Sequence, residues 1–160
     1  MNLANIPLEL GGTHELVITR AFKVPPALAF SVWTSREHLV RWWGPRDETG
    51  VDYSTPHCES DFRPGGRYRI CIRSPQGKDS WLGGEYREIE PPGKIVLTFQ
   101  WEADGHPMTL IELRFEDDGA GGTRFHFRQR GLPDAASRDM HEIGWNRWAD
   151  RLRDYLDTLA

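Results

Sequence analysis

Turn signals divide the middle of this 160-residue chain at short intervals, and they constrain its fold more than any other feature. Pro-Gly, Gly-Gly and Asp-Gly steps recur between residues 63 and 122, with short segments between them. Within these segments apolar and polar residues alternate, as in residues 67–73 (RYRICIR). A period of two with one apolar face is typical of antiparallel strands joined by hairpins. The sequence therefore predicts a half-buried antiparallel meander.

Other patterns flank the meander on both sides. Residues 14–22 are rich in β-branched side chains and predict a strand, which two prolines end. Short helices are expected over residues 26–33 and 36–43. Residues 134–160 contain no proline, and their apolar side chains recur at helical spacing. This last segment predicts a long amphipathic helix that lies across the apolar face of the sheet.

Length, charge and cysteine count restrict the class of protein. A chain of this length predicts a single domain over residues 13–160, preceded by a flexible segment over residues 1–12. A net charge of −4 argues against a broad nucleic-acid interface. The sequence contains no apolar run long enough to span a membrane and no secretory signal, and two cysteines make no disulfide framework. We therefore expect a cytoplasmic protein.

Five short motifs, taken in order, give the chain a family resemblance. They are Arg20-Ala-Phe-Lys-Val-Pro, Trp42-Trp43-Gly44-Pro45, Asp61-Phe-Arg-Pro-Gly-Gly66, Gly84-Glu-Tyr-Arg-Glu-Ile and Gly144-Trp145. The set resembles the activator of heat-shock-protein-90 ATPase homologue-like family of the START-like (SRPBCC) superfamily, over residues 14–160. The resemblance implies an α+β helix-grip fold. In this fold a curved antiparallel sheet of six to seven strands wraps around a long C-terminal helix, and two short helices follow the first strand.

The resemblance also implies a function. It predicts a hydrophobic cavity between sheet and helix that binds a small hydrophobic or amphipathic ligand without a cofactor. A cyclase- or hydrolase-type enzyme is one alternative, and a chaperone-interaction module is another. The eukaryotic co-chaperone of that name has an additional N-terminal domain that contacts the chaperone, and this chain has no room for one. An exposed edge strand would allow a homodimer.

Aromatic side chains are abundant, with seven tryptophans in the chain. Most of them are expected to fill the interior, while a subset near one mouth of the cavity would contact the ligand. Glycines at 65, 66, 83 and 84 would let the sheet bend and leave that cavity open. The residues expected to contact the ligand are Trp42, Tyr68, Trp81, Tyr86, Phe99, Trp101, Met140 and Trp145.

One polar set is a candidate for catalysis. Alternation places His57, Glu59 and Asp61 on one face of an extended strand. A hairpin centred on Pro64-Gly65 would pair Asp61 with Tyr68 and turn the set toward the cavity, where it could bind a polar group or act as acid and base. A shift of one residue would turn the set to solvent, with Asp61 bonding the amides of the turn. Both registers remain open, and the second is favoured.

The first register would also place Cys58 opposite Cys71, as two free thiols in a reducing compartment. No group of histidines and cysteines has the spacing of a zinc site, so no metal is expected.

Arg20 interrupts an apolar strand and is a candidate for a buried ion pair with a carboxylate. His141, near the start of the last helix, could reach the mouth of the cavity.

Overall fold

A computed structural model describes residues 8–160 of the chain. It contains one antiparallel sheet of seven strands in the order β1-β7-β6-β5-β4-β3-β2. The strands are β1 (His14–Phe22), β2 (Ser54–Ser60), β3 (Arg67–Arg73), β4 (Asp79–Glu90), β5 (Lys94–Trp101), β6 (Thr109–Asp117) and β7 (Thr123–Leu132). The helices are α1 (Pro26–Ser31), α2 (Arg36–Trp42) and α3 (Ala135–Leu159).

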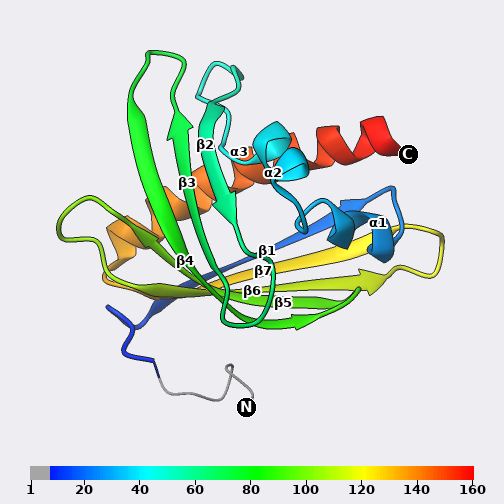
Figure 1. Cartoon of the computed structure of the whole chain (residues 1–160), viewed down its shortest axis with the longest axis horizontal. Helices are drawn as coiled ribbons and strands as arrows, with labels where there is room; N and C mark the ends of the chain where they lie inside the picture. Colours follow the sequence, from blue (N-terminus) through cyan, green and yellow to red (C-terminus); the bar gives the residue numbers. More distant parts are fainter. Residues whose placement is uncertain (1–7) are drawn as a thin grey trace.

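The sheet bends sharply, and the bend makes room for the long helix. In Figure 1, β1, β7, β6 and β5 run along the length of the molecule, whereas β2 and β3 rise steeply across them. The 12-residue strand β4 connects the two groups. At the bend, a Cβ at position 84 would collide with the Thr98 carbonyl of β5, so only glycine allows the two backbones to come this close.

Helix α3 lies in the angle of the bent sheet (Figure 1). Its first turn is capped by Asp134, whose carboxylate accepts a hydrogen bond of 2.7 Å from the Ser137 amide. The short helices lie on the same side of the sheet, where α2 contacts both β2 and α3. Gly44 follows α2 with a φ of 102°, a conformation that favours glycine, and turns the chain toward β2.

A cluster of aromatic rings fills most of the space between sheet and helix. Trp148 of α3 lies at its centre, 5.2 Å from Trp145 and 5.6 Å from Trp42 between ring centroids. The other rings within 6.5 Å of Trp148 are Trp33, Trp43, Phe125 and Phe127. Most of the tryptophans therefore pack the interior, as expected.

The architecture confirms the predicted α+β helix-grip fold, with seven strands, two short early helices and a long last helix. Arg20 forms the expected ion pair with a carboxylate, because its Nη1 lies 2.7 Å from Oδ1 of Asp150 on α3. The pair is not buried as expected, since the two side chains are 22% and 41% exposed. Of the segment expected to be flexible, residues 1–7 lie outside the described part, and the Gly11 amide donates to the Met108 carbonyl at 3.2 Å. No helix within residues 8–160 is long and apolar enough to cross a membrane.

The register between β2 and β3 is the favoured one of the two alternatives, which is shifted by one residue and turns His57 and Glu59 to the outer face of the sheet. Ser60 pairs with Tyr68 and Cys58 with Ile70. The placement of Cys58 opposite Cys71 was therefore wrong, since Cys71 pairs with His57 on the opposite face of the sheet. Both thiols are free and buried, and burial raises the pKa of Cys58 to about 11, which keeps it protonated at neutral pH.

Candidate functional site

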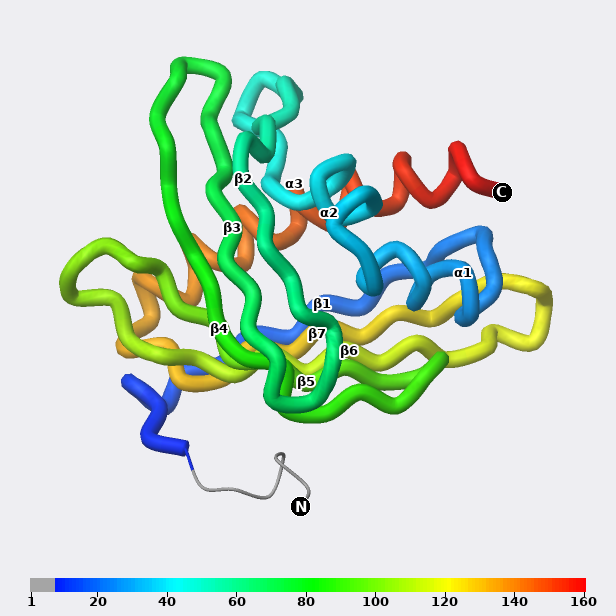
Figure 2. The backbone as a smooth tube through the Cα atoms, viewed as in Figure 1, coloured from blue at the N-terminus to red at the C-terminus, as the bar shows by residue number. Residues whose placement is uncertain are grey.

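An open and largely apolar pocket of about 710 Å³ lies at one end of the space between α3 and the sheet. Three segments form its rim: the turn between β3 and β4, the loop between β5 and β6, and the first half of α3. Figure 2 shows the β3–β4 turn rising away from the rest of the sheet. The floor consists of side chains of the aromatic core, including Phe99, Trp145 and Trp148.

The periodicity of the strands and of α3 explains which side chains line this pocket. Leu82 of β4 and Phe99 of β5 point inward and are fully buried. Met140, Gly144 and Trp148 follow one another at intervals of four along α3 and face the same side. A Cβ at Gly144 would meet nothing within 4 Å, so the helix leaves open space there.

Five of the eight residues expected to contact a ligand line this pocket: Trp81, Phe99, Trp101, Met140 and Trp145. Met140 is 73% exposed at the rim, whereas Phe99 is fully buried at the floor. Trp81 reaches the rim from the outer face of the sheet, where the Arg69 guanidinium stacks on its ring at 4.1 Å from the centroid. The pocket therefore combines a buried aromatic floor with an accessible aromatic and thioether rim.

The other three residues are part of the core, and their polar atoms bond to the protein. Trp42 is fully buried and donates from Nε1 to the Val32 carbonyl at 3.1 Å. The Tyr68 hydroxyl donates to the Thr98 carbonyl at 2.6 Å. The Tyr86 hydroxyl shares a 2.7 Å hydrogen bond with Ser60, and burial raises its pKa to about 12. None of the three lines the apolar pocket, because Trp42 ends α2 within the closed core and the two tyrosines lie on β3 and β4 away from the rim. Alternation alone does not reveal this placement.

The candidate acid and base residues lie on the outer face of β2 and its following turn. The His57 ring packs against Trp81 at 5.2 Å between centroids, and its Nε2 lies 3.3 Å from Oε1 of Glu59. The Asp61 carboxylate pairs with Arg63 at 2.8 Å. Because the register turns all three away from α3, none of them lines the apolar pocket.

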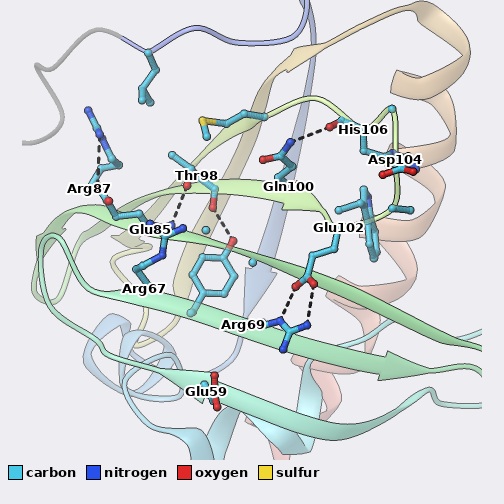
Figure 3. Close-up of a pocket in the computed structure, with 18 residues that line it drawn as sticks. Glu59, Arg67, Arg69, Glu85, Arg87, Thr98, Gln100, Glu102, Asp104 and His106 are labelled. Carbon is cyan, nitrogen blue, oxygen red and sulfur yellow. Dashed lines mark hydrogen bonds and ion pairs between the residues drawn. The ribbon is translucent and has the colours of Figure 1, made fainter.

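A second and more polar pocket of about 900 Å³ lies on the opposite face of β3, β4 and β5 (Figure 3). Charged residues line it, and several of them pair with one another. Arg69 bonds Glu102 through two hydrogen bonds of 2.7 and 2.9 Å, and Arg87 lies 3.5 Å from Glu85. His106, in the β5–β6 loop, lines both pockets, so this loop separates the polar pocket from the apolar one.

A buried hydrogen-bond chain fixes the ring of Trp145 at the floor of the apolar pocket. Its Nε1 donates to the Gln129 side-chain oxygen at 2.7 Å, and Nε2 of Gln129 donates to the Thr109 hydroxyl at 3.0 Å. The Thr109 hydroxyl in turn donates to the Phe99 carbonyl at 2.7 Å. Gln129 is fully buried, so this chain satisfies an amide that would otherwise be costly in the core.

The partners of His141 determine its proton positions at the pocket rim. Its Nδ1 lies 2.7 Å from the Ser137 carbonyl, which only accepts, so Nδ1 carries the proton. Its Nε2 lies 3.1 Å from the Trp101 indole nitrogen, which only donates, so Nε2 accepts. Burial, opposed by the bond to Ser137 and assisted by nearby His106, lowers the pKa of His141 below its usual 6.5. The neutral ring holds Trp101 in place.

Sequence reasoning did not place His106, Lys78 or Gly144 at this site. The helical spacing of Met140, Gly144 and Trp148 was a usable signal for the glycine, because a small residue in an apolar stripe leaves a gap. Lys78 and His106 sit in connecting segments, whose position in space no periodic pattern predicts.

Comparison with known proteins gives the family. The profile of the family described as "Activator of Hsp90 ATPase homolog 1-like protein" matches residues 23–157. The chain belongs to this family. The match includes every residue that lines the apolar pocket, from Trp43 to Trp148. The expected family resemblance is therefore confirmed, whereas comparison with curated proteins finds no match.

Solved structures share the family fold. A protein described as AHSA1 from Silicibacter pomeroyi is 22% identical, with a TM-score of 0.79 over 92% of this chain and 100% of that one. A protein from Chromobacterium violaceum is 21% identical, with a TM-score of 0.76 over 89% and 96% of the two chains. An uncharacterized protein from Rhizobium leguminosarum is 24% identical, with a TM-score of 0.74 over 91% and 95%. At these identities the likeness shows a common fold.

The lowered pKa of His141 in this family member predicts a pH dependence of stability. A histidine whose folded pKa is depressed binds fewer protons than the same histidine in the unfolded chain. The free energy of unfolding should therefore fall as the pH drops through 6.5 toward the folded pKa, with no contribution from His141 well above 6.5. Urea unfolding at pH 7.5 and 5.5 measures this difference. His141→Gln should show a smaller loss than the wild type, and an equal loss would contradict the prediction.

Proposed function

We propose that this protein binds a small hydrophobic or amphipathic ligand in the apolar pocket between α3 and the β3–β4 and β5–β6 connections. The observation that supports this function best is the unfilled space in front of Gly144, within a pocket of about 710 Å³. Small-molecule sites are commonly apolar clefts of about 300–1,000 Å³ with a few polar groups. A ligand there would cover the exposed side of Met140 and the half-buried ring of Trp101.

Binding is better supported than catalysis at this site. Both ring nitrogens of His141 already bond to the protein, at Ser137 and Trp101. The two carboxylates of the rim, Asp79 and Glu102, each bond an arginine at 2.7 Å. These groups are better placed to hold the walls in position than to transfer a proton to a ligand.

Filling the pocket from α3 should abolish binding without unfolding the protein. Gly144→Leu adds a side chain where a Cβ meets nothing within 4 Å. Replacing a helical glycine stabilises a helix by roughly 0.5–1 kcal/mol, so the free energy of unfolding should not fall. The affinity for the fluorescent probe N-phenyl-1-naphthylamine should fall at least about tenfold, because the side chain occupies the same volume. Fluorescence titration and urea unfolding measure the two effects.

Ala136→Leu is the matched control, since it enlarges an exposed position of the same helix outside the pocket lining. It should leave the probe affinity within about twofold. Tight probe binding to a folded Gly144→Leu protein would show that the ligand site is elsewhere.

A further inference from the structure

We propose that the ligand of the apolar pocket is an anion: an aromatic or alicyclic body bearing a carboxylate or sulfonate that lies at the rim beside Lys78 and His106. This inference rests on the proposed function and specifies its ligand class. Its basis is the distribution of paired and unpaired charges around the pocket.

The negative charges of the rim are neutralised from the outer face of the sheet. Asp79 bonds Arg73 through two hydrogen bonds of 2.7 and 3.1 Å. Glu102 bonds Arg69 in the same bidentate way. Such a planar pair uses both carboxylate oxygens, so neither acid offers a free charge to a ligand.

The positive charge of the rim is not neutralised in this way. Lys78 is exposed in the β3–β4 turn, where its backbone amide bonds Ser74, and within residues 8–160 its ammonium has no ion-pair partner. On the β5–β6 loop, the backbone carbonyl of His106 accepts from Gln100 at 2.9 Å (Figure 3). The imidazole of His106 has no hydrogen-bond partner within residues 8–160. Both residues line the apolar pocket. The Lys78 ammonium and the His106 ring N–H are therefore the donors that this rim offers to an acidic group.

The floor and the rim then select different parts of one molecule. Phe99 and Trp145 are buried and apolar, and their polar neighbours already bond to one another, so they favour the apolar body. The charged group would remain near solvent at Lys78, which avoids the cost of burying an ion. An exposed charge contributes up to about 1 kcal/mol, which corresponds to a change of about fivefold in affinity.

Two probes with the same aromatic body test this inference. 1-Anilinonaphthalene-8-sulfonate carries a sulfonate, and N-phenyl-1-naphthylamine is its neutral counterpart. Lys78→Gln should weaken binding of the sulfonate about fivefold at low salt, and Lys78→Glu should weaken it more, because a like charge then faces the anion. The neutral probe should bind both variants within about twofold of the wild type. Lys23→Gln, at an exposed position outside the pocket, is the control for net charge.

The outcomes separate the ligand class from the site itself. The anion inference is wrong if the Lys78 and Lys23 variants weaken sulfonate binding equally, or if neither weakens it. The proposed ligand site would still hold in that case, provided that Gly144→Leu abolishes binding of both probes. If Gly144→Leu leaves both probes bound, the site is wrong. Loss of sulfonate binding in the Lys78 variants alone, reduced by added salt in the wild type, supports the inference.

Discussion

Trp148→Ala should lower the free energy of unfolding by about 4 kcal/mol, which corresponds to a fall in melting temperature of roughly 10 °C. Trp148 is 2% exposed, and six aromatic rings lie within 6.5 Å of it. Its removal would leave a large cavity between α3 and the sheet, which a rigid cluster of rings cannot close. Urea unfolding followed by far-UV circular dichroism measures the loss without depending on tryptophan emission.

Two further variants test whether this loss of stability comes from the packing of the Trp148 ring in the aromatic cluster. Trp148→Phe should cost only about 1–2 kcal/mol, because it keeps most of the ring volume and removes an indole N–H that has no hydrogen-bond partner within residues 8–160. Trp81→Ala removes the same side chain from a half-exposed position on the outer face and should cost less than half as much as Trp148→Ala. Equal losses at positions 81 and 148 would contradict a central role for the cluster.

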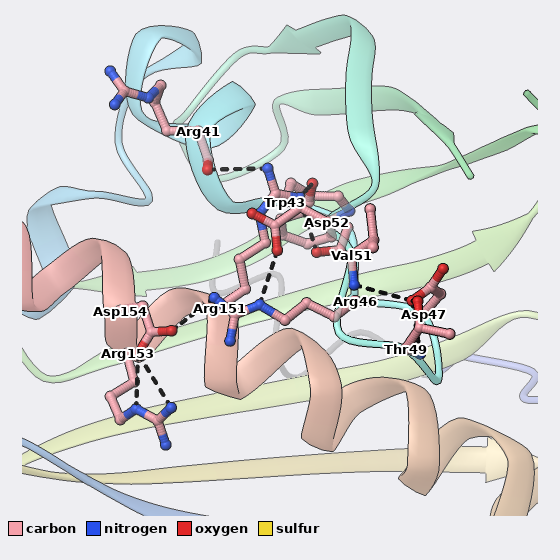
Figure 4. Close-up of polar contacts among 11 residues, drawn as sticks. Arg41, Trp43, Arg46, Asp47, Thr49, Val51, Asp52, Arg151, Arg153 and Asp154 are labelled. Atoms are coloured by element: carbon pink, nitrogen blue, oxygen red, sulfur yellow. Dashed lines mark hydrogen bonds and ion pairs between the residues drawn. The ribbon is translucent and has the colours of Figure 1, made fainter. Parts of the chain in front are cut away.

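Arg151→Met should lower the free energy of unfolding by about 3 kcal/mol, since it removes the group that connects α3 to the end of α2. The guanidinium of Arg151 is largely buried and donates to the carbonyls of Arg41, Trp43 and Gly44, each at 3.1 Å (Figure 4). These carbonyls include the last ones of α2, which no intrahelical amide can satisfy. Methionine replaces the aliphatic volume but leaves the carbonyls without donors.

Arg153 provides the matched control on the same helix. It is 44% exposed and pairs with Asp150 and Asp154 at 3.5 and 3.1 Å. Arg153→Met should therefore cost less than about 1 kcal/mol. Trp43 and Gly44 also line the apolar pocket, so Arg151→Met should weaken probe binding as well. A stable Arg151→Met protein with unchanged probe affinity would show that these three bonds are not needed to hold the segment.

Local patterns were sufficient to predict the elements of this fold. Alternation in residues 67–73 and helical spacing in residues 134–160 arise from geometry within each element, so one sequence reveals them. The β2–β3 register depends on the hydrogen bonding of the hairpin turn, which alternation does not reveal. The Asp61 amide donates to the Arg67 carbonyl at 3.0 Å, which centres the hairpin on Pro64 itself and moves every pair by one residue.

The sequence predicted only part of the candidate site, because periodicity describes each strand or helix separately. Inward-facing positions such as Phe99 and Trp145 were identified, but alternation does not tell where along a strand the interior is left unfilled. Trp42 and Tyr86 face inward too, yet they lie where the core is closed. The opening depends on Gly144 and on two connections, whose positions follow from the bend of the sheet.

The pairing of the first strand with the last has a consequence for synthesis of the protein. β1 pairs with β7, as in Arg20 opposite Phe125, which lies about 100 residues further along the chain. At a translation rate of roughly 10 residues per second, β1 is synthesised about ten seconds before its partner strand. The sheet cannot close during that time, and α3, which fills it, is made later still. Folding of this domain should therefore wait until β7 and α3 have been synthesised rather than begin with β1.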